Sequence, residues 1–172
     1  IEGFCPDPLF KESDENRITA ASTIGMFRFP LIISKTPEPP GGIIFGYRQP
    51  SLIVAIENKG AVPVGMTIVF KANGTLENPS LINVNTQKYF KINKTMRAGE
   101  EIRINTMVGE KKIQGILNGE TNNYFKYRDL ESEWLQLEVG DNLFRYDADS
   151  DIGNLEVYIY FRNKYLEVQE CY

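Results

Sequence analysis

The chain has 172 residues, 42% of them hydrophobic, and a formal net charge of −4, which suits one domain with a sizeable core. Lysine and arginine are scattered and no apolar run approaches the roughly 20 residues of a membrane helix, so neither a nucleic-acid nor a membrane partner is expected. Histidine is absent, which removes the commonest general base and the commonest metal ligand.

The two ends of the chain offer little to classify it. The first ten residues lack a basic segment followed by a long apolar one, so we expect no signal peptide. The chain starts with Ile1 rather than Met, which fits a piece of a longer protein as well as a processed one. Cys5 and Cys171 could pair if the termini meet in adjacent strands, but two thiols in a chain this long do not imply a disulfide framework.

The N-terminal third is irregular. Residues 11–17 form a charged segment, and residues 34–42 contain three prolines and two glycines, which indicates a loop or a polyproline-like spacer. Neither flank is long enough to fold alone. We therefore expect both segments to be surface excursions within a single domain that spans residues 1–172.

From residue 64 onwards, alternating apolar residues dominate. In residues 64–72, Met66, Ile68, Phe70 and Ala72 share one face, and Thr67, Val69 and Lys71 share the other. Turn signals such as Asn118-Gly119 separate such runs at intervals of roughly 8–12 residues, which is typical of a β-sandwich or barrel. The further strand-like runs are residues 80–84, 89–93, 101–106, 111–117 and 155–161.

Two local patterns add to this picture. Residues 127–134 are the best helical candidate and are short enough to be a single turn. Residues 99–105 and 140–146 share a glycine, an acid, a polar residue and an aliphatic residue, then a strand with an arginine. Each could be a turn that starts a strand with its aliphatic residue, Ile102 or Leu143, facing inward, although hairpins also resemble one another without any repeat.

The alternating acids Asp147, Asp149 and Asp151 are a candidate calcium loop, because odd positions of a loop can converge on one ion. The spacing of a helix–loop–helix calcium site fails, since Gly153 comes one residue late and no acid occupies the twelfth position. An exposed acidic turn between two strands is the simpler interpretation, so we predict no metal site.

Paired carboxylates could support glycoside hydrolysis. Most of the available acids fall in predicted turns, where carboxylates are simply solvated. We therefore predict no enzyme, with no catalytic residue and no cofactor. The acids considered are Glu100, Glu101, Asp129, Glu131, Glu133 and Asp141.

Aromatic residues are the more serious candidate site, because flat rings can stack on sugars as they do in carbohydrate-binding sandwiches. Tyr158 and Tyr160 alternate with Val157 and Ile159, so one of the two sets should face outward. Core packing and cover of edge strands explain aromatic residues equally well and are the favoured interpretation. The residues concerned are Tyr124, Phe125, Tyr127, Trp134, Tyr158, Tyr160 and Tyr165.

Six segments in order carry a family resemblance. Together they resemble the C-terminal half of the distal tail proteins of long-tailed bacteriophages, the siphovirus-type tail component. Residues 3–10 resemble the passage from the first domain of that family to its second. The six segments are residues 46–50, 62–71, 78–85, 90–95, 98–106 and 137–150.

The resemblance implies a structural role in the virion tail tip, after synthesis in the bacterial cytoplasm. Distal tail proteins form hexameric rings through their N-terminal domain and connect the tail tube to tail-tip, baseplate or receptor-binding proteins. The C-terminal domain is an antiparallel β-sandwich of galectin-like or carbohydrate-binding-module-like (jelly-roll) shape outside the ring. Since the ring-forming domain is absent here, we expect this chain alone to be a monomer or a weak oligomer.

The expected function is therefore docking of neighbouring tail proteins. Loops carry many binding functions, so residues 11–17, 34–42 and 118–123 are candidate contacts. The alternative is a carbohydrate-binding module for host cell-wall glycans. The exposure of Trp134, Tyr158 and Tyr160 should discriminate the two, because burial of all three removes the main support for glycan binding.

Overall fold

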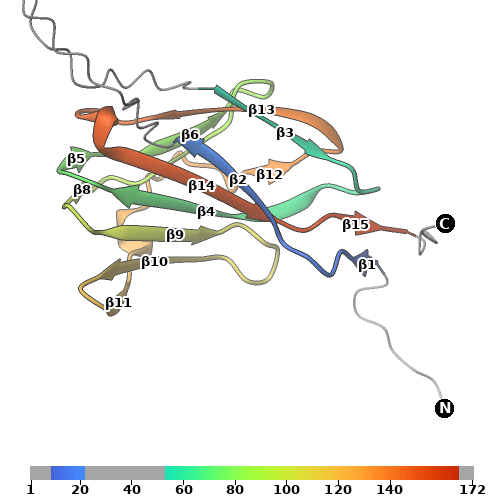
Figure 1. Ribbon diagram of the computed structural model, residues 1–172, viewed down its shortest axis with the longest axis horizontal. Coiled ribbons are helices and arrows are strands. Elements are labelled where there is room, and N and C mark those ends of the chain that lie inside the picture. Colours follow the sequence, from blue (N-terminus) through green and yellow to red (C-terminus); the bar gives the residue numbers. More distant parts are fainter. Residues whose placement is uncertain (1–8, 22–52, 167–172) are drawn as a thin grey trace, which may run out of the picture.

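Two antiparallel sheets face each other across one core in the computed structural model, which describes residues 9–21 and 53–166 (Figure 1). The larger sheet has the strand order β11-β10-β9-β4-β14-β2, and β12 pairs with β4 beside this path. Its strands are β2 (Asn16–Ala21), β4 (Val64–Ala72), β9 (Glu101–Asn105), β10 (Lys112–Leu117), β11 (Glu120–Asn123), β12 (Gln136–Leu137) and β14 (Leu155–Phe161).

The smaller sheet has the strand order β3-β13-β6-β7. Its strands are β3 (Ile53–Asn58), β6 (Ser80–Asn83), β7 (Tyr89–Lys91) and β13 (Gly140–Asp147). Two short pairs complete the strands: β1 (Phe10–Lys11) with β15 (Lys164–Tyr165), and β5 (Leu76–Glu77) with β8 (Thr95–Met96). Single turns of 3₁₀-helix lie at η1 (Phe125–Tyr127) and η2 (Ile152–Asn154).

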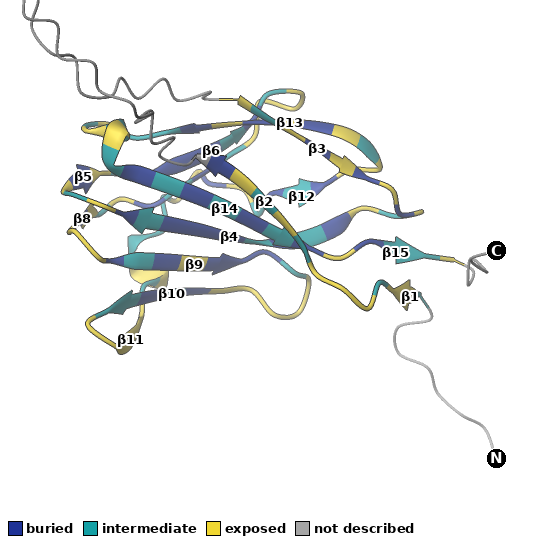
Figure 2. Ribbon diagram, viewed as in Figure 1, coloured by how far each residue is buried: buried dark blue, intermediate teal, exposed yellow. Residues whose placement is uncertain are grey.

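The core lies between the inward faces of the two sheets. Successive side chains of a strand point to opposite faces, and β14 accordingly alternates buried and half-buried residues along its length (Figure 2). Phe70 of β4 and Phe144 of β13 are both fully buried, so large apolar side chains from both sheets fill the space between them. The prediction of an all-β antiparallel sandwich is confirmed.

The strand predictions hold in detail where the alternation is strong. Residues 64–72 and 155–161 coincide with β4 and β14, and Met66, Ile68, Phe70 and Ala72 are indeed the buried side of β4. Asn118 and Gly119 form the predicted hairpin turn, with φ of 52° and 84°, between Leu117 and Glu120, which are paired. Two-residue turns of this kind need positive φ at both positions, which Asn and Gly tolerate best.

The helical turn expected at residues 127–134 is wrong. The only helical residues nearby are those of η1, which ends at Tyr127. The following segment instead runs beside β7: the amides of Asp129 and Glu133 donate to the carbonyls of Lys91 and Tyr89, at 3.1 and 2.9 Å. These two backbone donors are satisfied by a strand, so they are not available for a helix.

The parallel expected between residues 99–105 and 140–146 holds only in part. Gly99 and Gly140 both adopt positive φ, at 81° and 88°, and Ile102 is fully buried. Leu143, however, is 37% exposed and faces outward, while its neighbour Asn142 is buried.

Several features named from the sequence lie outside the described residues. These are Cys5, Cys171 and residues 34–42. Nothing helical in the described part of the chain is both long enough and apolar enough to cross a bilayer.

Candidate functional site

Outward-facing side chains of the larger sheet form cross-strand rows. In the first row, Arg17 of β2 lies opposite Tyr160 of β14, which lies opposite Thr67 of β4. The row continues through Asn105 of β9 to Lys112 of β10. Because neighbouring strands lie about 4.8 Å apart, these four steps span about 19 Å.

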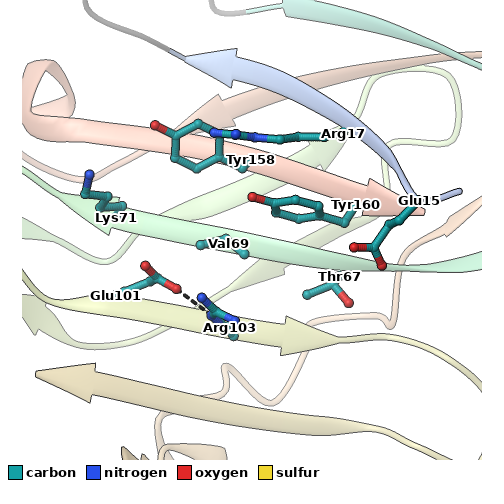
Figure 3. Close-up of a pocket in the computed structure, with 9 residues that line it drawn as sticks. All are labelled: Glu15, Arg17, Thr67, Val69, Lys71, Glu101, Arg103, Tyr158 and Tyr160. Carbon is teal, nitrogen blue, oxygen red and sulfur yellow. Dashed lines mark hydrogen bonds and ion pairs between the residues drawn. The ribbon is translucent and has the colours of Figure 1, made fainter. Parts of the chain in front are cut away.

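A second row runs beside the first. Tyr158 lies opposite Thr19 on one side and Val69 on the other, and Arg103 follows opposite Val69 and next to Gln114. The two rows border a hollow of about 470 Å³, and we call its lining the tyrosine face (Figure 3). The tyrosine face consists of Glu15, Arg17, Thr67, Val69, Lys71, Glu101, Arg103, Tyr158 and Tyr160.

Arg17 stacks on the two tyrosines of this face. Its guanidinium carbon lies 4.7 Å from the centre of the Tyr158 ring and 5.9 Å from that of Tyr160 (Figure 3). A guanidinium at this distance is attracted by the negative face of the ring. The contact therefore holds three long side chains of two strands in a defined arrangement.

Ion pairs order the charged residues of the same face. Arg103 bonds the carboxylate of Glu101 at 2.5 Å, and Lys71 lies 3.6 Å from that of Glu156. Burial would raise the pKa of Glu156, but hydrogen bonds from Asn73 and Tyr158 and the charge of Lys71 outweigh it and keep that pKa below its ordinary value. Glu156 is therefore ionised at neutral pH and neutralises Lys71.

Tyr158 keeps its proton for a related reason. Burial, followed by the hydrogen bond to Glu156 (2.9 Å), raises the pKa of Tyr158 above its ordinary value. A phenol that holds its proton this firmly donates a hydrogen bond and does not act as a base near neutral pH. The tyrosine face thus offers rings, a stacked guanidinium and neutralised ion pairs, a set that suits binding rather than proton transfer.

The candidate loops are only partly brought to this face. Residues 11–17 contribute Glu15 and Arg17, and Arg17 lies within strand β2 rather than in a loop. Residues 118–123 form the hairpin turn and β11, whose four residues are exposed at the edge of the larger sheet. They do not line the hollow.

The seven candidate aromatic residues do not form one surface. Tyr158 and Tyr160 belong to the tyrosine face, and Tyr165 lies in β15. The others cluster around η1, where Trp134 lies 5.1 Å from Phe90 and 6.0 Å from Phe125 between ring centres, and Tyr124 packs edge-on against Tyr127. Trp134, Tyr158 and Tyr160 are all half-buried, so none of the three is removed from contact with a ligand.

Two of the three alternating aspartates are committed to local contacts. Asp149 pairs with Lys91 at 2.9 Å and accepts a hydrogen bond from Asn78 at 2.8 Å. Asp147 accepts the amide of Ala148, and Asp151 has positive φ. Among the described residues, no three acidic or sulfur side chains are placed to hold a metal ion together.

The acids considered for hydrolysis are also dispersed. Glu100 is buried beside Lys94, Glu101 pairs with Arg103, and Glu133 pairs with Lys88. Asp129 and Glu131 lie closest to each other, since the hydroxyl of Tyr89 is within hydrogen-bond reach of both carboxylates, at 3.1 and 3.4 Å. Asp141 is exposed on β13.

Sequence reasoning missed most of the tyrosine face. The alternation of residues 64–72 places Thr67, Val69 and Lys71 on the outer side of one strand, but no pattern shows that Arg17 and Arg103 are their neighbours. The available signal was the strict alternation around Tyr158, which predicts that the tyrosines and the core residues face opposite ways.

Comparisons with known proteins agree with this architecture. A family model described as the siphovirus-type tail component, C-terminal domain, matches residues 59–165. The fold is similar to that of Dit (gp 19.1) of phage SPP1, a protein described as a paradigm of the hub adsorption apparatus of phages that infect Gram-positive bacteria. The match has 13% identity and a TM-score of 0.61, and covers 93% of this chain and 50% of that one.

A chain of the phage P2 baseplate, solved in its activated conformation with Ca, is similar at 14% identity and a TM-score of 0.48, over 90% of this chain and 54% of that one. The chain therefore spans about half the length of these solved chains. No curated protein matches it. Because the family match covers more than half of the residues and the sandwich agrees with it, the chain belongs to the family of siphovirus-type tail components and carries their C-terminal domain.

Proposed function

We propose that this chain is the C-terminal module of a distal tail protein and docks a neighbouring tail-tip, baseplate or receptor-binding protein through the tyrosine face. The observation that carries the proposal is the pair of ordered rows on the outside of a seven-stranded sheet. Side chains already held by stacking and ion pairs lose little freedom on binding. Tyrosine and arginine are also among the residue types most enriched in interface hot spots.

The role is structural rather than enzymatic. Membership of a phage tail component family supports a place in the virion, at the tail tip, for a protein made in the bacterial cytoplasm. The lining of the tyrosine face supports the same conclusion, since Glu101 is ion-paired with Arg103 and Tyr158 keeps its proton.

We further propose that residues 1–172 are one sandwich domain of a longer tail protein, which assembles as a hexameric ring through its other half. The length of the SPP1 Dit chain, of which this chain covers 50%, supports this. Light scattering of the isolated chain should give a monomer of 19.6 kDa. A stable hexamer of this chain alone would contradict the assignment of ring formation to the missing half.

Glycan binding is the second candidate function, because Tyr158, Tyr160 and Trp134 remain accessible. Docking is favoured over it, since Arg17 already covers the ring of Tyr158, where a sugar would have to stack. Retention of the chain on purified host cell walls, lost on Tyr158→Ala or Trp134→Ala, would favour the glycan hypothesis instead.

Substitutions on the tyrosine face of the whole tail protein test the docking function. Arg17→Glu should leave the fold intact and weaken the contact with the neighbour about tenfold or more, as expected for a hot spot. The measurement is the protein composition of purified tail tips by quantitative mass spectrometry. Arg162→Glu, at an exposed arginine outside the tyrosine face, is the matched control. Unchanged composition with both Arg17→Glu and Tyr158→Ala would contradict the proposal.

A further inference from the structure

The outside of the smaller sheet carries a different chemistry from the tyrosine face. One cross-strand row there consists of Ile53 of β3, Arg145 of β13, Ile82 of β6 and Tyr89 of β7. In the next row, Leu143 lies opposite Ala55. Apolar side chains thus occupy outward positions on three neighbouring strands.

These apolar side chains are accessible to solvent. Ile53 is 51% exposed and Leu143 is 37% exposed, and Figure 2 shows exposed stretches along both β3 and β13. By contrast, Val69, the apolar residue at the centre of the tyrosine face, is only 5% exposed. Single exposed apolar residues are ordinary, but a contiguous set on one face is typical of a contact surface.

A hollow of about 670 Å³ opens along the first row, from which Ile82, Tyr89 and Arg145 line it, and carboxylates form much of the rest of its lining. Its ionisable lining comprises four acids, Asp129, Glu131, Asp147 and Asp149, against the cations Lys91 and Arg145. We call the hollow and the two apolar rows together the acidic face. At its rim, Leu130 is 91% exposed between two of the acids.

The charge of the hollow persists at neutral pH. Lys91 is held by Asp149, at 2.9 Å. Hydrogen bonds from Asn93 and Tyr89 outweigh partial desolvation and keep the pKa of Asp129 below its ordinary value. With two cations against four acids, the lining carries a net charge of about −2, so a basic partner gains both affinity and association rate there.

We propose that the acidic face is a second docking surface, which binds a protein segment carrying lysine or arginine flanked by apolar side chains. The apolar rows would cover the partner's apolar residues, and the hollow would receive its cation. The module would then hold one neighbour on each side of the sandwich. This goes beyond docking through the tyrosine face and does not depend on it.

Cross-linking of native tail tips tests this directly. A carbodiimide joins carboxylates to lysines in contact with them, so peptides containing Glu131 or Asp147 should appear cross-linked to lysines of a different tail protein. Glu120, fully outside the acidic face on β11 and exposed, is the reference carboxylate. Cross-links at the acidic face no more frequent than those at Glu120, or cross-links only to a second copy of this chain, would overturn the proposal.

Two variants of the whole tail protein measure how much the apolar rows and the carboxylates of the hollow each contribute to binding. The binding probe is the neighbouring protein identified by cross-linking. Leu143→Asp should weaken binding about tenfold or more, whereas Val108→Asp, at a residue 81% exposed on another part of the surface, should not. Glu131→Lys should slow association several-fold and flatten its salt dependence. Equal affinity for the Leu143 and Val108 variants would overturn the proposal, whatever Arg17→Glu does on the opposite face.

Discussion

The guanidinium of Arg17 rests on the ring of Tyr158, 4.7 Å from its centre, and so joins β2 to β14 by a side-chain contact as well as by the backbone ladder. In the described part of the sheet, β2 is an edge strand with β14 as its only neighbour. The contact therefore both shapes the tyrosine face and fastens the strand that borders it.

Arg17→Ala should lower the free energy of unfolding by about 0.5–1 kcal/mol, the usual worth of an exposed cation–π contact. A double-mutant cycle with Tyr158→Leu, followed by urea denaturation, isolates that coupling from other effects of each change. Arg162→Ala paired with Tyr158→Leu is the control and should be additive. Additivity of the Arg17 pair as well would mean that the stacking contributes no stability.

The sandwich itself follows from the sequence because its strongest signals are local. Strict alternation predicts which side chains of β4 and β14 enter the core, and Asn118-Gly119 predicts a hairpin. The rows of the tyrosine face could not be predicted in this way. They depend on which strands become neighbours, and Arg17, Thr67 and Tyr160 are far apart along the chain.

Leu143 shows where hydrophobicity alone misleads. The side chain of buried Asn142 donates to the carbonyls of Glu138 and Gly140, at 2.8 and 2.9 Å, and accepts the amide of Glu138 at 2.9 Å. Satisfying these backbone groups requires the side-chain amide of Asn142 to point inward. Because successive side chains of a strand point to opposite faces, Leu143 then points outward. The acidic face was therefore not visible in the sequence.

Lys94 and Glu100 form the most buried ion pair of those described. Their charged atoms lie 2.7 Å apart, and the side chain of Glu100 is 1% exposed. Lys94→Met leaves a carboxylate without its cation in the interior and should cost about 3 kcal/mol at neutral pH, measured by urea denaturation. Lys59→Met, at a side chain 68% exposed, should cost almost nothing.

The same variant should change how stability depends on pH. In the natural chain, burial alone would raise the pKa of Glu100, but Lys94 and the amide of Arg97 keep it below 4.5, its ordinary value. That contribution is present above pH 4.5 and is lost as the pH falls through the folded-state pKa. Without Lys94 the pKa should rise, so the variant should instead gain stability on acidification from neutral pH. If the free energy of unfolding changed with pH in the same way in Lys94→Met and in the natural chain, this expectation would be wrong.

Tyr124 should govern stability at alkaline pH. Burial, and then its hydrogen bond to Glu100, raise its pKa from 10.0 to about 12. A raised folded-state pKa contributes stability that is complete below pH 10 and is lost as the pH rises from 10 to 12. Denaturation across this range should show a smaller loss for Tyr124→Phe than for the natural chain. Tyr165→Phe, as control, should behave like the natural chain.

Gly115 makes room for the ring of Tyr124. A β-carbon at position 115 would lie 1.9 Å from Cε2 of that ring, so Gly115→Ala must displace a side chain held by Glu100 and should cost about 1–3 kcal/mol through overpacking. Thermal denaturation should show that loss. The cost should fall when Tyr124→Ala removes the ring, and Gly153→Ala, where nothing lies within 4 Å, should be nearly neutral. An equal cost with and without the ring would assign the glycine to backbone conformation instead.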